Sequence, residues 1–164
     1  MHVISSHETV SGIGLVAVGA AALGLISRIP AGAFAAAQSS LLTPAIVVGV
    51  CVVLAPALYI GLSLAGAKTS ASTFVSAVLT SWRASGLAAL GLAPPLLFMV
   101  ATTTSENLAL ALGTLAIAAA LAIGLMALAR EAAEHSAASF LCFVLWSLAA
   151  LAVGARFFFT AVSA

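Results

Sequence analysis

The chain has 164 residues, of which 64% are hydrophobic and 5% charged, and its formal net charge is +1. A water-soluble domain needs roughly 25% charged residues, so the composition excludes a soluble enzyme. It equally excludes a nucleic-acid-binding protein with a basic surface. What remains is an integral membrane protein.

The hydrophobic residues fall into five long runs separated by short polar breaks. A helix needs about 20 mostly apolar residues to cross a bilayer. The runs are unbroken and rich in Ala and Leu, unlike the alternating ten-residue strands of a membrane β-barrel. We therefore predict an all-α integral membrane bundle of about five helices, forming a single transmembrane domain over residues 1–164. The expected spans are approximately 10–27, 43–66, 74–101, 107–129 and 137–158.

Arg83 is the residue whose burial in lipid would cost most. If the third span starts near residue 74, Arg83 lies roughly 15 Å into it, where a cation costs about 2.5 to 3.5 kcal/mol. It would then be a candidate functional residue. Alternatively, the amphipathic stretch 73–83 forms a short interfacial helix, with Trp82 and Arg83 at headgroup level. The span would then begin near Ala84, and this is the interpretation that we favour.

The third span also contains adjacent prolines, Pro94 and Pro95. Because proline has no backbone N–H, the pair is expected to kink or loosen the helix. A break of this kind can line a binding cavity in a membrane protein. We interpret it as a packing kink.

Small residues spaced four apart are candidate helix contacts. In lipid they allow two helix backbones to approach closely, and close packing replaces the hydrophobic effect as the force that holds helices together. The chain has four such pairs in its predicted spans: Ala20 with Gly24, Ala109 with Gly113, Ala120 with Gly124, and Ala150 with Gly154.

Side chains that could support chemistry are scarce. Glu131, Glu134 and His135 share one face if the fourth helix continues through them, which is a pattern that a metal site requires. A charged, solvated turn between two spans is the simpler interpretation. Cys51 and Cys142 each lie within a span without a Cys-x-x-Cys partner, and we read them as small apolar residues. We therefore predict no catalytic residues, no metal and no cofactor; a bound lipid or pigment would leave no signature in the sequence.

The basic residues suggest an orientation. Five spans place the two termini on opposite sides of the membrane, with Lys68, Arg83 and Arg130 on the amino-terminal side and Arg28 and Arg156 on the other. The positive-inside rule then favours a cytoplasmic amino terminus. The abundance of Ala and Gly with a single Lys suggests a bacterial source, and a helical protein there belongs in the inner membrane.

Residues 49–104 contain a loose motif. The stretch from Val53 to Tyr59 approaches the end of a span near Gly66, a Thr/Ser linker follows, and residues 91–94 then precede an apolar run and Thr102–Thr104. In these features the chain resembles the Yip-domain family of five-span membrane proteins, in particular its small bacterial relatives. For eukaryotic members the resemblance implies binding to small GTPases and to each other through a cytoplasmic amino-terminal region. Only about nine residues precede the first expected span, so a GTPase partner is not carried over, and the bacterial relatives imply no catalytic residues.

Three functions are compatible with these observations. The first is a non-enzymatic scaffold, anchor or accessory subunit, with membrane lipid, other membrane subunits or a second copy as partners and with no nucleic acid. The second is a transport or channel component that uses Arg83 and a break at Pro94 and Pro95, and the third is a metal-dependent membrane enzyme at the Glu131 cluster. Since transporters usually show internal repeats and several intramembrane ionisable residues, we expect the first.

Overall fold

The computed structural model describes residues 6–67, 69–132 and 136–163. The described residues contain no strand. The elements are α1 (Ser6–Ser27), a single 3-10 turn η1 (Ile29–Ala31), α2 (Ala33–Leu64), α3 (Ala71–Thr102), α4 (Glu106–Ala132) and α5 (Ala137–Ser163). Each of the five α-helices is long and apolar enough to cross a membrane. The prediction of an all-helical, multi-pass membrane protein is confirmed.

The second helix begins ten residues earlier than the sequence suggested. Pro44, at the start of the span expected over 43–66, lies inside α2, as does Pro56. The boundary is set instead by Gly32, whose φ of 106° lies in the left-handed region that glycine adopts readily. The link between α1 and α2 is therefore only η1 and its flanking residues, which folds these two helices into a hairpin.

The third helix corrects the expectation of a separate interfacial helix at residues 73–83. It is continuous from Ala71 to Thr102, and the hydroxyl of Ser70 caps its first turn by accepting the backbone N–H of Thr73 at 3.2 Å. Phe74 and Ala77 are buried among side chains of α2, α4 and α5. The first turns of α3 therefore belong to the core of the bundle, because their apolar side packs against α2, α4 and α5.

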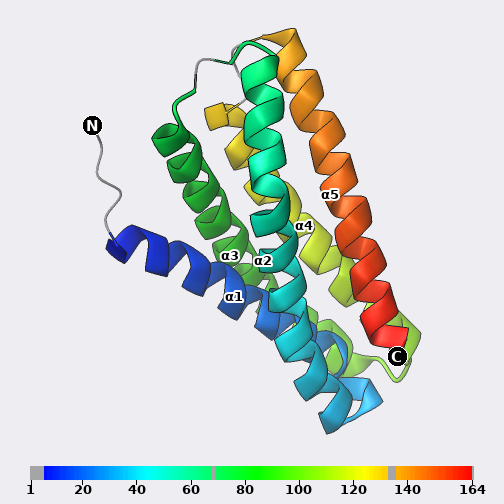
Figure 1. Ribbon diagram of the computed structural model, residues 1–164. Helices are drawn as coiled ribbons and strands as arrows, with labels where there is room; N and C mark the ends of the chain where they lie inside the picture. The colour runs from blue at the N-terminus through cyan, green and yellow to red at the C-terminus, as the bar shows by residue number, and fades with distance from the viewer. Residues whose placement is uncertain (1–5, 68, 133–135, 164) are drawn as a thin grey trace.

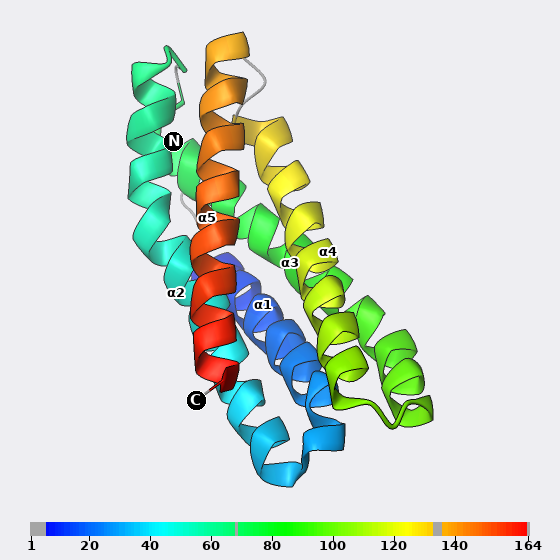
Figure 2. The same ribbon diagram turned by 90° about the vertical axis from the view of Figure 1, so that its right-hand side faces the viewer.

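The helices form a bundle in which α1 lies obliquely across α2 and α3, while α5 lies beside α2 (Figure 1). Viewed from the side, α4 and α5 separate toward the end that carries the carboxyl terminus (Figure 2). Two buried clusters hold the bundle. One joins α2, α3, α4 and α5, and the other joins α1, α3 and α4.

The outer surface is apolar on every helix. Phe34 is 84% exposed, Leu115 67% and Leu145 61%. An apolar surface of this extent would drive association in water, whereas hydrocarbon chains solvate it without cost. The outward faces of the helices are therefore the lipid-facing surface.

Candidate functional site

A close backbone-to-backbone helix contact lies where α1 crosses α3. A Cβ added to Gly86 would lie 2.5 Å from the carbonyl carbon of Leu15 and 2.6 Å from the backbone nitrogen of Val16. A Cβ added to Gly19 on α1 would lie 2.8 Å from the carbonyl oxygen of Gly86. The two backbones thus touch with no side chain between them. The sequence reasoning missed this contact because Gly19 and Gly86 belong to no pair of small residues that we selected.

Three of the four predicted small-residue pairs lie against neighbouring helices. A Cβ on Gly24 would lie 2.6 Å from the carbonyl oxygen of Ser39 on α2, and one on Gly124 would lie 2.9 Å from that of Ser81 on α3. Gly113, the glycine of the pair with Ala109, contacts Ser27 of α1. The buried or contacting members of these pairs are Ala20, Gly24, Ala109, Gly113, Ala120 and Gly124.

The fourth pair, on α5, has different surroundings. A Cβ on Gly154 would meet no atom within 4 Å, so no helix packs closely against this glycine. Ala150, one turn away, is half-buried. Both residues line a cavity, so their small side chains leave space rather than bring two backbones together.

Arg83 joins α3 to α1. Its guanidinium donates from Nε at 3.0 Å and from Nη2 at 2.6 Å to the hydroxyl oxygen of Ser11. The side chain is half-buried, and its Cγ approaches Gly12. Hydrogen bonds from a charged donor are stronger than neutral ones, so this contact compensates part of the cost of placing the cation between two apolar helices.

Pro94 and Pro95 do not break α3, which remains helical through both. Their rings are exposed on the outer surface, where no interhelical packing has to adjust to them. They lie 11 and 12 residues beyond Arg83, or roughly 17 Å along the helix. The prolines and Arg83 therefore do not share a site.

Other polar side chains also link helices. The hydroxyl of Ser81 on α3 donates to the carbonyl oxygen of Gly124 on α4 at 2.8 Å. The indole Nε1 of Trp146 on α5 donates to the carbonyl oxygen of Leu54 on α2 at 2.9 Å. Such bonds between membrane helices typically contribute about 0.6 kcal/mol and at most about 2 kcal/mol. They fix which helix faces lie together.

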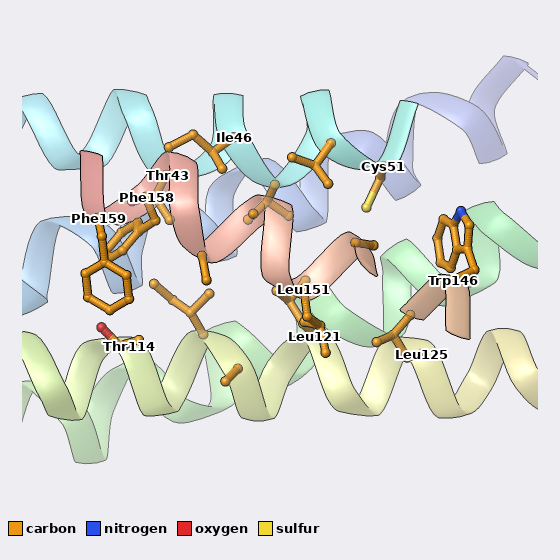
Figure 3. Close-up of a pocket in the computed structure, with 17 residues that line it drawn as sticks. Thr43, Ile46, Cys51, Thr114, Leu121, Leu125, Trp146, Leu151, Phe158 and Phe159 are labelled. Carbon is orange, nitrogen blue, oxygen red and sulfur yellow. The ribbon is translucent and has the colours of Figure 1, made fainter. Parts of the chain in front are cut away.

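A cavity with a volume of about 150 Å³ lies between α2, α4 and α5. It is lined by five residues of α2 from Thr43 to Cys51, five of α4 from Thr114 to Leu125, and seven of α5 from Trp146 to Phe159. We call it the α4–α5 groove. Trp146 lies at one end and Phe158 and Phe159 at the other, with Leu121 and Leu151 between them (Figure 3).

Two further hollows adjoin this groove. A cavity of about 40 Å³ shares Cys51, Leu125 and Trp146 with it, and a shallower depression of about 430 Å³ lies between α2 and α5 on the outer surface. Arg83, Pro94 and Pro95 belong to the lining of none of these three. No sequence pattern indicates the groove, because it is formed by side chains of three helices whose relative positions depend on the whole fold.

The candidate metal residues lie at the end of α4. Glu131 is exposed, whereas Glu134 and His135 fall outside the described residues. Within the described ranges, no three His, Cys, Asp or Glu side chains gather as a metal site would require. Cys51 and Cys142 are both free thiols.

Comparison with known proteins adds no relative. No protein-family model, curated protein or solved structure matches the chain. The resemblance to Yip-domain proteins therefore stays a prediction.

Proposed function

We propose that this chain is a non-enzymatic membrane protein that acts as a scaffold, anchor or accessory subunit of a larger membrane assembly. The observation that supports the proposal is that polar side chains in the interior form hydrogen bonds between the helices of this chain. Ser81, Arg83 and Trp146 each donate a hydrogen bond to a different helix of the same chain. Their polarity thus serves to hold the bundle together, which is the requirement of a structural subunit. The long, apolar outer faces of α2 and α5 are available to other membrane helices.

The test is to isolate the protein with what it binds. An affinity handle is placed after Ala164, the membranes are extracted in a mild detergent, and the eluate is sized and identified by mass spectrometry. We expect a large complex of fixed stoichiometry that is absent when the untagged chain is expressed in the same cells. Elution alone, or as a small homo-oligomer, contradicts an accessory-subunit role.

We also propose the bacterial inner membrane as its location, with a cytoplasmic amino terminus. The support is the distribution of charge between the two sides of a five-span chain, with Lys68 and Arg130 on the amino-terminal side. Alkaline phosphatase fused after residue 164 is then expected to be active, because it folds outside the cytoplasm, and green fluorescent protein at the same position to be dark. The reverse pair of signals overturns this orientation.

A further inference from the structure

We propose that the α4–α5 groove binds one hydrocarbon chain of a membrane phospholipid. This inference concerns a ligand site and does not depend on the role of the protein as a subunit. It rests on three properties of the groove, namely its shape, the state of the polar atoms around it, and its opening toward the lipid phase.

The shape of the groove suits a chain and excludes a helix. Its lining on α5 runs from Trp146 to Phe159, a length of roughly 20 Å at 1.5 Å per residue. The volume of the groove is only about 150 Å³, which is far less than a helix of this length occupies. A partner helix has a diameter of about 10–12 Å and cannot enter, whereas a single file of methylene groups can.

Few polar atoms line the groove, and most of them are already hydrogen-bonded. The hydroxyl of Thr114 donates to the carbonyl oxygen of Leu110 at 2.8 Å, and the indole of Trp146 donates to Leu54. The thiol of Cys51 is only weakly polar and packs as a small hydrophobic group.

Thr43 also lines the groove and has a buried hydroxyl without a hydrogen-bond partner, but this oxygen is packed against Gly24 of α1. The lining thus offers an entering molecule almost only carbon. A headgroup or a quinone ring would lose its hydrogen bonds there, while a saturated chain loses none.

The groove reaches the outer surface, because its lining residues Leu151 and Phe159 are 39% and 50% exposed. A hydrocarbon chain of a phospholipid can therefore enter the groove sideways from the bilayer. Gly154 provides room at the middle of the α5 lining, since nothing lies within 4 Å of a Cβ built there. A bound hydrocarbon chain would make dispersion contacts with the side chains on both sides of the groove.

The experiment uses the full chain in digitonin, a detergent that has a rigid sterol body in place of an alkyl chain. Phosphatidylcholine carrying a diazirine on one acyl chain is titrated in, activated with light, and the labelled peptides are mapped by mass spectrometry. We expect labelling that saturates at one lipid per protein, concentrated on peptides containing Leu121 and Leu151. Labelling that rises linearly and falls on outward residues such as Leu115 as strongly as on the groove shows a lipid annulus only and overturns the proposal.

A matched pair of variants tests whether the hydrocarbon chain binds in the α4–α5 groove. Gly154→Phe fills the groove, whereas Gly14→Phe places the same side chain on α1, at a glycine that also has open space around its Cβ. We expect the saturable labelling to be lost in the first variant and retained in the second. Equal labelling of the two folded variants overturns the proposal.

A second measurement avoids bulky substitutions. In a Cys142→Ala background, Cys51 in the lining is the remaining thiol and can be labelled with N-ethylmaleimide. Unlabelled phosphatidylcholine is expected to slow this labelling to a plateau, because the chain covers the thiol. A labelling rate that phosphatidylcholine leaves unchanged contradicts occupancy of the groove.

Discussion

Replacing Gly86 with alanine is expected to destabilise the bundle by about 1–3 kcal/mol or more, the range for overpacking a tight contact. The added methyl group would meet the carbonyl carbon of Leu15 at 2.5 Å and the nitrogen of Val16 at 2.6 Å. These are backbone atoms of a helix and cannot rotate out of the way. Helix α1 would have to move off α3, which would also open the contact between Gly19 and Ala89.

The matched control for this substitution is on the same helix. Gly91 is exposed, and a Cβ there would meet nothing within 4 Å. Gly91→Ala is therefore expected to be neutral or to stabilise by about 0.5–1 kcal/mol, because alanine loses less backbone entropy in a helix. Unfolding with dodecyl sulfate in mixed micelles, followed by circular dichroism, measures both. Equal stability of the two variants would show that α1 and α3 do not meet at Gly86.

The second large effect is expected at Arg83. Arg83→Ala removes two hydrogen bonds from a charged donor to Ser11, and bonds of this kind contribute about 1.5–3 kcal/mol. Arg83→Lys should lose less than alanine but still fall short of the native protein, because an ammonium cannot donate in the forked geometry of guanidinium. The readout is the free energy of unfolding in the same micelles.

A double-mutant cycle assigns this effect to the contact itself. Ser11→Ala removes the acceptor, and if the two side chains act together, the double variant is less destabilised than the sum of the single variants by about 0.5 kcal/mol or more. Additive losses would mean that Arg83 stabilises the protein through other contacts. Solute flux in liposomes that is abolished by Arg83→Ala while stability is unchanged would favour a transport role instead.

The membrane class and the five helices could be predicted because they depend on local composition. The length and apolarity of each run decide whether it crosses a bilayer, and neither requires knowledge of its partners. The same is true of small residues such as Gly24 and Gly124, whose chemistry permits close approach in any arrangement. Which helix approaches them depends on the path of the whole chain, and for that reason the crossing of Gly19 with Gly86 was not foreseen.

The interfacial helix was predicted wrongly because Arg83 was considered as an isolated cation. Its neighbour Ser11 lies 72 residues earlier in the chain, and no local pattern connects the two. Gly154 also has the spacing of a packing residue, but within this chain the structure places open space beside it.

The two longest helices have a consequence for the bilayer that surrounds them. At 1.5 Å per residue, α2 and α3, with 32 residues each, are about 48 Å long, whereas the hydrocarbon core of a typical bilayer is about 30 Å thick. An upright helix would leave roughly 18 Å beyond the hydrocarbon. This hydrophobic mismatch must be absorbed by tilt, by local thickening of the membrane, or by helix ends that reach through the headgroups. Phe34 and Leu64, both 84% exposed near opposite ends of α2, make deep protrusion into water unfavourable, so the protein and its membrane must adjust to each other in thickness.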